Sequence, residues 1–329
     1  MIRSRSQQRE VGFILIVVLG TVLTLSALLF GFNQRTRTSL NAADGFYRTE
    51  QVWNSAWAGL QIAIAAVGDA NDLSADNRFA SLLTGENTFT VGDASCSVTI
   101  LEENGLLNVN YLTGQDGEPE RRRVERFLRL IDLLNRQDKD LERIGYGIVS
   151  SIIDWVDADD AVTHLPFIKN ENTGAESGYY EAQAPPCACR NRPIDNLDEL
   201  ISVKGITPEN LDRLRPFLTC MGDGRININA APKLVIESLS EQIDGALAQM
   251  IVNRREMKPF GAATELRDIP GMTDNIYRAI KDTVTTRPAD RYYRVTARGN
   301  VEDRKGTIEA VLRRNTRAGN VDTILYREL

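Results

Sequence analysis

The chain has 329 residues, of which 42% are apolar and 26% charged, enough for about two globular domains and too balanced for a disordered, collagen-like or low-complexity protein. Its 39 basic and 45 acidic residues give a net charge of −6, which argues against broad binding to a nucleic-acid backbone, because that binding depends on neutralising phosphates. The single histidine, His164, leaves little room for zinc catalysis of the usual multi-histidine kind.

An apolar segment near the N-terminus is the most informative element. Residues 11–34 carry no charge, and the core at residues 13–32 would form a helix about 30 Å long, which spans a bilayer. Three arginines and one glutamate precede it, and such a cationic start places the N-terminus on the cytoplasmic side. A cleaved secretory signal fits poorly, because the apolar run exceeds the usual length of about 7–15 residues and no A-x-A site follows. A plain signal-anchor helix remains an alternative.

The helix is expected to continue beyond the membrane, through residues 33–70. Apolar side chains recur there at spacings of three, four and seven residues, which is typical of one face of a long helix; they are Phe46, Trp53, Trp57, Leu60, Ile64 and Val67. We expect this face to pack against the protein's own domain.

A strand region and a helical region follow. Residues 95–112 are predicted to form two short strands joined at residues 102–105, where Asn-Gly is a strong hairpin signal. The next helix carries an apolar face opposite a solvated, arginine-rich face; the apolar residues are Val124, Phe127, Leu128, Ile131 and Leu134. A further helix is predicted over residues 141–156, before a long polar loop at residues 158–192. Loops of that length are usually functional or tied down.

An internal repeat follows the loop. Residues 199–219 and 265–285 align without gaps at an offset of 66 and share their apolar pattern, and residues 107–110 and 226–229 have the same alternation of apolar residues with asparagine. At the C-terminus, residues 292–301, 306–314 and 323–329 alternate apolar and polar side chains. This alternation predicts three antiparallel strands with one wet face.

The strongest candidate binding site is acidic. Four aspartates, Asp154, Asp157, Asp159 and Asp160, fall within seven residues, and Glu176 follows in the polar loop. Such carboxylates repel one another unless they are solvated or share a cation, and clustered oxygen ligands suit calcium. The segment is not an EF-hand, because no glycine stands at the sixth position. A purely solvated acidic loop remains the alternative.

The cysteines and glycine turns carry weaker signals. If the domain is exported, a disulfide is plausible; Cys187 and Cys189 are too close in sequence to pair easily with each other, so we expect one of them to pair with Cys220. The turns at Gly205 and Gly271 resemble helix-hairpin-helix modules, whose backbone N–H groups contact phosphates in DNA-binding proteins. A membrane-anchored DNA receptor of a competence or pilus system is therefore the rival function. Signatures of enzymes are missing, and we expect no catalytic activity.

The junction that ends the basic leader resembles the cleavage site of type IV prepilins, including the pseudopilins of type II secretion. In that family a membrane peptidase cuts after the glycine and methylates the new N-terminus, which would make Gly12 the last leader residue and Phe13 the first mature residue. Most members carry glutamate at the fifth mature position, where this chain has Val17. Loss of that carboxylate resembles the K-type minor pseudopilin, which sits at the filament tip.

The order of the motifs resembles the K-type minor pseudopilins along nearly the whole chain. The matching pieces are the leader and helix, the first Asn-x-Asn, the DWVDADD loop with GAE, the NRPIDNLDELISVKGIT stretch and NINAAP. The resemblance implies an α+β, type IV pilin-like fold, with a long N-terminal helix, an antiparallel sheet and a large α-helical insertion. The expected segments are a leader at 1–12, a transmembrane helix at 13–32, its periplasmic continuation at 33–70, the first strands at 88–112, the insertion at 113–221, and the hairpin repeat with the remaining sheet at 222–329.

The same resemblance implies partners and a structural cofactor. It implies calcium bound by Asp157, Asp159 and Glu176, with Asp160 as a weaker candidate. It also implies assembly with the I-type and J-type minor pseudopilins and processing by prepilin peptidase. The helix would lie in inner-membrane lipid before assembly and the soluble domain in the periplasm, and no nucleic acid is expected as a partner.

Overall fold

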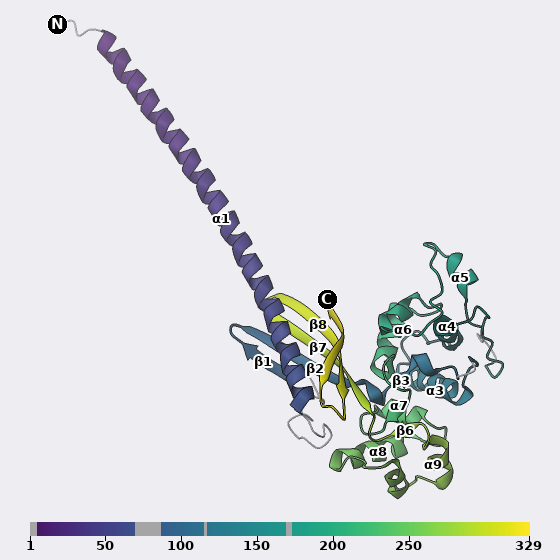
Figure 1. The fold of residues 1–329 in the computed structure, drawn as a ribbon. Helices are drawn as coiled ribbons and strands as arrows, with labels where there is room; N and C mark the ends of the chain where they lie inside the picture. Colours follow the sequence, from purple (N-terminus) through teal and green to yellow (C-terminus); the bar gives the residue numbers. More distant parts are fainter. Residues whose placement is uncertain (1–4, 70–86, 115–116, 169–172) are drawn as a thin grey trace.

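The computed structural model describes residues 5–69, 87–114, 117–168 and 173–329; the first four leader residues and the predicted last helical residue, 70, lie outside these ranges. One helix, α1 (Arg5–Asp69), runs for 65 residues and projects far beyond the rest of the molecule (Figure 1). It is long and apolar enough to cross a membrane, and its most apolar stretch is not buried by any of the residues that the structure describes. The prediction of a single long N-terminal helix is confirmed.

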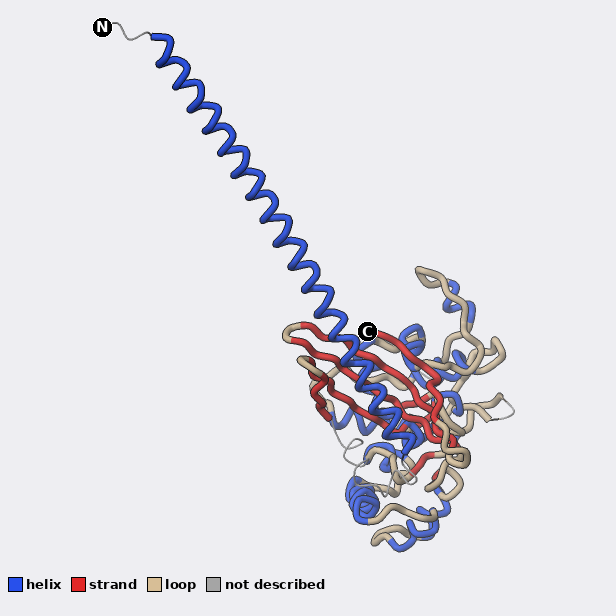
Figure 2. Tube along the Cα trace, turned by 60° about the vertical axis from the view of Figure 1, so that its left-hand side comes forward, coloured by secondary structure: helices blue, strands red, loops and turns tan. Residues whose placement is uncertain are grey.

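The C-terminal part of α1 packs on a five-stranded antiparallel sheet (Figure 2). The strands are β1 (Asn87–Val91), β2 (Ala94–Glu102), β7 (Asp290–Val301), β8 (Arg304–Asn315) and β9 (Val321–Glu328), in the spatial order β1-β2-β7-β8-β9. The three predicted C-terminal strands are therefore confirmed as β7, β8 and β9.

The helix face that meets the sheet agrees in part with the predicted apolar stripe. Leu60 and Val67 are buried as expected, together with Val52, Ala56 and Ala63, whereas Phe46 is 77% and Trp57 43% exposed. Small residues line the contact because the two backbones approach closely. A Cβ added at Gly59 would lie 2.2 Å from Cys96 Sγ, far inside van der Waals contact.

The predicted hairpin at residues 102–105 is wrong. The hairpin partner of β2 is the preceding strand β1, and Glu103–Gly105 form the short 3₁₀ helix η1. The turn signal is overridden by long-range bonds: the Asn104 side chain donates to Asp290 O at 3.1 Å and accepts from Tyr292 N at 2.7 Å. Gly105 is needed for close approach, since a Cβ there would lie 2.5 Å from the carbonyl carbon of Ala230.

Between β2 and β7 the chain forms two units, each with its own hydrophobic core. The elements of the first unit are β3 (Leu107–Asn108), η2 (Val109–Tyr111), α3 (Arg121–Gln137), α4 (Gly147–Val156), α5 (Ser177–Glu181), η3 (Leu197–Ser202), α6 (Pro208–Leu214), η4 (Arg215–Phe217) and β4 (Leu218–Thr219). The elements of the second are β5 (Ile226–Asn227), α7 (Lys233–Ser238), α8 (Gly245–Met257), η5 (Ala263–Asp268), α9 (Asp274–Ile280) and β6 (Val284–Thr285).

Two predicted boundaries differ from those in the structure. The insertion was expected to end at residue 221, but the second unit also lies between β2 and β7 and packs around its own core, so the sheet resumes only at β7. The helix expected from residue 141 begins at Gly147, because the Asn135 side chain bonds both the N–H and the carbonyl of Ile144 and holds the preceding segment out of the helix.

The internal repeat is a structural repeat. Elements η3, α6 and β4 of the first unit correspond to η5, α9 and β6 of the second at the same offset, and Gly205 and Gly271 both have positive φ, at 84° and 89°. The asparagines shared by residues 107–110 and 226–229 hold distant backbone segments in place through hydrogen bonds. The side chain of Asn110 bonds the N–H and carbonyl of Ile194, and that of Asn229 bonds the N–H and carbonyl of Phe260.

Candidate functional site

Three buried carboxylates converge between α4 and α5. Asp154 lies in the last turn of α4, Asp157 directly follows that helix, and Glu176 stands at the N-terminal boundary of α5. Each offers an oxygen, and these oxygens lie within 4.8 Å of one another. We call Asp154, Asp157 and Glu176 the acidic cluster.

The acidic cluster is left without hydrogen bonds on the atoms that face inward. Among the described residues, Asp154 Oδ2, Asp157 Oδ1 and both carboxylate oxygens of Glu176 are buried and unpaired. Buried polar atoms in native proteins are rarely left so. The loop also crowds this point, because a Cβ added at Gly174 would lie 2.0 Å from Asp154 Oδ2.

Burial and mutual repulsion disfavour the ionised forms. Burial, followed by the charge of Asp159, raises the pKa of Asp157 to about 7, and burial, followed by the charge of Asp154, raises that of Glu176 to about 8. The pKa of Asp154 is raised as well, mainly by burial, although Thr163 N donates to its Oδ1 at 2.9 Å. A cation among these oxygens would reverse the balance, because it supplies the missing opposite charge.

The donor set fits a hard divalent cation. Calcium takes about six to eight oxygens at roughly 2.3–2.6 Å, so two oxygens on one ion are at most about 5 Å apart, as they are here. Three carboxylates meet that chemistry, and further ligands would have to come from backbone oxygens, water or neighbouring side chains.

The structure brings together two of the four predicted ligands, Asp157 and Glu176. Asp159 and Asp160 are exposed, and their side chains accept hydrogen bonds from backbone N–H groups. Asp159 accepts from Ala161 N at 2.8 Å, and Asp160 accepts from Ser177 N at 3.3 Å. Asp154 belongs to the acidic cluster but was not among the four predicted ligands. A signal was available, since it is the one charged residue of α4 and stands three positions before Asp157.

The predicted disulfide is not formed. All four cysteines fall within the described residues, and each thiol is free. Cys189 lies beside the acidic cluster, with its thiol 3.4 Å from Asp154 O. Cys220 instead lines a cavity with Glu103 and Arg294, at the edge of the sheet.

The predicted processing site lies inside α1. Gly12 and Phe13 are both helical, and Phe13 is 69% exposed. The exposed apolar side chains continue through the predicted transmembrane segment as far as Phe32, which is 71% exposed. Over the part of this stretch whose side chains the structure describes, the folded domain covers none of it, so the helix requires lipid or other helices to bury it.

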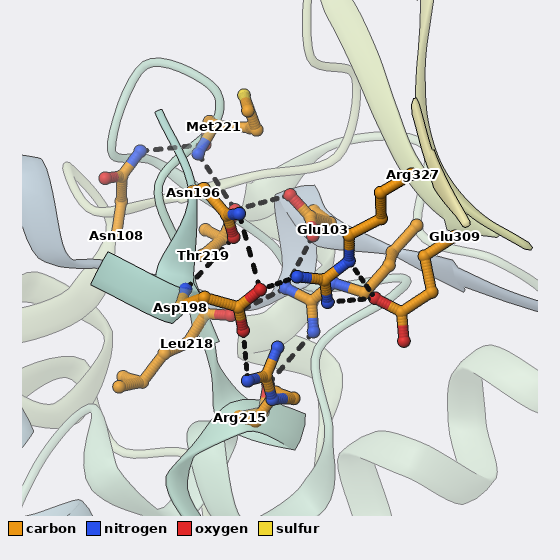
Figure 3. Close-up of polar contacts among 11 residues, drawn as sticks. Glu103, Asn108, Asn196, Asp198, Arg215, Leu218, Thr219, Met221, Glu309 and Arg327 are labelled. Carbon is orange, nitrogen blue, oxygen red and sulfur yellow. Dashed lines mark hydrogen bonds and ion pairs between the residues drawn. The ribbon is translucent and has the colours of Figure 1, made fainter. Parts of the chain in front are cut away.

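A network of ion pairs and hydrogen bonds, which we call the polar joint, connects the first unit to the sheet (Figure 3). Glu103 directly follows β2, and its side chain is 2% exposed; it pairs with Arg294 at 2.6 Å and accepts from Thr219 Oγ1 at 2.8 Å. Around it, Asp198 of the first unit pairs with Arg215 and with Arg327 of β9. Sequence patterns could not reveal this joint, because its contacts between the sheet and the first unit join residues far apart in the chain, such as Glu103 and Thr219, which are 116 positions apart.

The preceding residue connects the sheet to the second unit. Glu102 is buried, burial raises its pKa, and its Oε1 accepts from Asn227 Nδ2 at 2.6 Å. The two adjacent glutamates therefore connect the sheet to different units: Glu103 connects it to the first unit and Glu102 to the second.

The two hairpins do not present a surface suited to DNA. The helix after each glycine turn carries an acidic residue in its first turn, Glu209 in α6 and Asp274 in α9. These carboxylates stand where a phosphate would approach in a helix-hairpin-helix module, and they oppose it electrostatically. The geometry gives the rival DNA-binding function no support.

Comparison with known proteins separates the same two units. Residues 105–223 and residues 226–287 match two family models, each described as type II secretion system protein K. The two matches together cover more than half of the chain, and each falls on one unit of the insertion.

Whole-chain relatives agree. The chain is 23% identical to type II secretion system protein K of Klebsiella pneumoniae over 292 residues, covering 85% of this chain and 84% of that protein. It is 23% identical to protein K of Aeromonas hydrophila over 239 residues, covering 68% and 67%. A solved chain from the GspK–GspI–GspJ complex of enterotoxigenic Escherichia coli has a similar fold, with a TM-score of 0.63 and 17% identity over 90% of this chain and 99% of that one.

Proposed function

Since this chain belongs to the type II secretion system protein K family, we propose that it is the minor pseudopilin at the tip of the pseudopilus, where it initiates or caps assembly for protein export across the outer membrane. The observation that carries the proposal is α1, a continuous helix that carries exposed apolar side chains from Leu15 to Phe32 and packs on the sheet towards its C-terminal end. Such a helix fits lipid before assembly and a bundle of helices afterwards.

The position at the tip is supported by the insertion. Two helical units stand between β2 and β7, and they lie beside and beyond the C-terminal end of α1, far from its N-terminus (Figure 1). A further subunit stacked above would have to avoid this bulk. The valine at position 17 supports the same position, because a terminal subunit has no neighbour above whose N-terminal ammonium needs a buried carboxylate.

The proposed partners are the I-type and J-type minor pseudopilins. The similar solved chain comes from a complex with GspI and GspJ. On this chain, exposed aromatic side chains lie on α1 and the edge strand β9: Phe46 is 77% exposed, and Trp57 stacks on Tyr326 with ring centroids 5.5 Å apart. Exposed aromatic residues of this kind are typical anchors of protein interfaces.

The proposed processing site is the Gly12–Phe13 bond. Prepilin peptidase would remove the basic leader and methylate Phe13, with the leader in the cytoplasm and the folded domain in the periplasm. We propose no catalytic step for the chain itself, since anchoring, assembly and termination require only surfaces.

The proposed cofactor is a structural calcium ion held by Asp154, Asp157 and Glu176. The unpaired buried oxygens support it. The ion would tie α4 to the start of α5 and so close the loop between them, with Asp159 and Asp160 near enough in sequence to add ligands. It would neutralise repulsion within the cluster and take no part in a reaction.

The tip position is tested by locating the chain in assembled filaments. Wild-type protein carrying a small epitope after Leu329 should label only one end of each pseudopilus. A variant in which residues 104–289 are replaced by a two-residue turn should label the shaft as well, because the bulk is gone. Wild-type label along the shaft would overturn the tip assignment.

The processing step is tested by mass spectrometry of the mature protein from native membranes. A methylated Phe13 is the expected N-terminus. An intact Met1 would refute cleavage, and an N-terminus beyond residue 32 would refute membrane anchoring altogether.

A further inference from the structure

An open cleft lies in the first unit, at the end of α4 opposite to the acidic cluster. One wall is the segment that leads into α4 and its first turns, with Arg143, Gly147 and Ser151; the other is the glycine hairpin and α6, with Gly205 and Asn210. The cavity volume is about 490 Å³, and ligand-binding pockets usually measure roughly 300–1,000 Å³. The cleft is therefore large enough for an organic ligand, and a single water or ion would not fill it.

The walls of the cleft are fixed by contacts within the first unit. Arg213 of α6 donates to Glu142 O at 2.7 Å and pairs with Asp138 at 3.3 Å, so α6 is tied to the segment before α4. A Cβ added at Gly205 would lie 3.4 Å from Ile148 Cγ2, which places the hairpin against the first turn of α4. Such a pre-formed site binds a ligand with less loss of conformational freedom.

Asn210 is a buried amide that the fold leaves unused. The residue is 6% exposed and lines the cleft. Its backbone N–H donates to Thr207 Oγ1 at 3.2 Å, but its side chain forms no hydrogen bond with the residues that the structure describes. Buried amides are normally bonded, because burying an unpaired polar group costs free energy. The side chain therefore offers a donor and an acceptor to a ligand in the cleft.

The second hairpin shows that the fold does not require an amide at this position. At the repeat offset of 66, Asn210 of α6 corresponds to Ile276 of α9, which is 4% exposed. The N–H of Ile276 donates to the Thr273 hydroxyl at the start of its helix, as that of Asn210 does to Thr207. The two positions are equivalent in the repeat, yet one carries an amide and the other an aliphatic side chain. A ligand explains this difference, whereas packing does not.

The charge around the cleft favours an anionic group. Helix α4 begins without a side-chain cap and has no acidic residue in its first turn, so the positive end of its dipole is uncompensated. Arg143 and Lys204 line the cleft, and neither forms an ion pair with a described carboxylate. Against these two basic residues stands one acidic residue of the described lining, Glu142, so the balance is positive.

The geometry points to a binding site for an extended, acidic peptide segment of another protein. The Asn210 side chain bonds a peptide group of this segment, as the side chains of Asn110 and Asn229 each bond a backbone N–H and carbonyl elsewhere in the fold. An aspartate or glutamate of the segment lies at the N-terminus of α4, within reach of Arg143. A peptide supplies both the N–H and the carbonyl that the amide can bond, which a simple anion does not. The cleft is separate from the contacts on α1 and β9 proposed above, so the inference goes beyond the proposed function and does not rest on it.

The test uses the full chain in detergent and a minimal probe, N-acetyl-aspartate N-methylamide, which carries one carboxylate between two peptide groups. The rise in unfolding temperature across a millimolar titration gives the dissociation constant. The asparagine analogue of the probe, sodium acetate and sodium phosphate are titrated at matched ionic strength. Wild-type protein should bind the aspartate probe about tenfold more tightly than any of these three.

Two variants test the contacts separately. Asn210→Ile places in α6 the residue that α9 carries at the equivalent position, so without probe it should unfold no earlier than wild type, and its affinity for the probe should be about tenfold lower. Arg143→Gln, at an exposed position, should weaken binding of the aspartate probe but not of its asparagine analogue. Arg136→Gln is the matched control, because it removes an exposed charge of α3 outside the cleft, and it should bind the probe as wild type does.

Three outcomes would overturn the proposal. The probe could fail to protect wild type, or it could bind both cleft variants as tightly as it binds Arg136→Gln. Acetate or phosphate could also protect as well as the probe, which would indicate an adventitious ion only. Labelling along the filament shaft, or an intact leader, would leave these binding results unchanged, so the inference and the proposed function fail separately.

Discussion

The substitution Glu176→Gln should stabilise the metal-free protein and at the same time remove most of the stabilisation that calcium gives. In the metal-free protein Glu176 is buried beside Asp154 and Asp157, and both of its oxygens lack partners among the described residues. Removing its charge should therefore stabilise the metal-free fold. The same change removes a ligand, so the stabilisation by calcium should be lost or strongly reduced.

The magnitude follows from linkage. A ligand at about 100 times its dissociation constant stabilises the folded state by about 2.7 kcal/mol. For a domain of roughly 150–250 residues, each kcal/mol shifts the unfolding temperature by about 2–4 °C, so calcium should raise it by roughly 5–10 °C. In EDTA the Glu176→Gln protein should unfold above wild type, because the pKa of Glu176 is raised to about 8 by burial and by its acidic neighbours.

The assay is thermal unfolding of the full chain at pH 7.5, in EDTA and across a calcium titration. Glu181→Gln is the matched control, since it removes an exposed charge from the same short helix, α5. The control should keep the full calcium shift and change nothing in EDTA. If Glu176→Gln keeps the full shift, or destabilises the metal-free protein as it would on losing a hydrogen bond, the cation site is refuted.

Three further predictions concern pH, helix packing and the joint. In EDTA, the free energy of unfolding should fall as pH rises from about 5 to 8, by up to about 1.4 kcal/mol per pH unit for each proton lost. The reason is that the pKa values of Asp157 and Glu176 are raised to about 7 and 8, so the fold favours their protonated forms. Urea unfolding at a series of pH values measures this slope; calcium should flatten it, and a free energy of unfolding that rises with pH would contradict the prediction. Gly59→Ala should destabilise the fold by about 1–3 kcal/mol, although alanine has the better helix propensity. Cys96→Ala should rescue this variant in a double-mutant cycle, because the added methyl group clashes with Cys96 Sγ. If the effects of the two substitutions were simply additive, the close approach of α1 to the sheet would be refuted. Glu103→Gln should cost about 3 kcal/mol, because it breaks a largely buried ion pair and leaves the partly buried Arg294 without its counter-ion. Glu241→Gln is the control: its partner Arg129 is 3.8 Å away at the surface, so the change in urea stability should be under about 1 kcal/mol.

Local periodicity predicted the elements whose structure is decided locally. The long helix, the three C-terminal strands and the repeat all followed from spacing in the sequence, and each is present. The hairpin at residues 102–105 was wrong because Asn104 and Gly105 serve contacts with β7 and with the second unit. A turn signal says nothing of partners nearly 200 residues away.

The residues of the candidate site were predicted only in part, again because a sequence pattern does not show which side chains meet in the fold. Aspartates close in sequence were visible, but their directions were not, and the resemblance that supplied the ligand set named exposed Asp159 and not buried Asp154. The joints made by Glu102 and Glu103 could not be predicted at all. Their partners Asn227 and Thr219 lie 125 and 116 residues away, and only the folded chain brings them together.

The placement of the insertion has a consequence for how the sheet forms. Strands β2 and β7 are direct neighbours, with Glu102 opposite Tyr293, so residues 103–289 are, for the sheet, a single connecting loop. Closing an unfolded loop of that length instead of a tight turn costs roughly 3 kcal/mol of chain entropy. Once the two units are folded and held by Glu102 and Glu103, the ends of this loop are already close together. The pairing that completes the sheet then becomes nearly local, and the order of events along the folding pathway should be insertion first, sheet second.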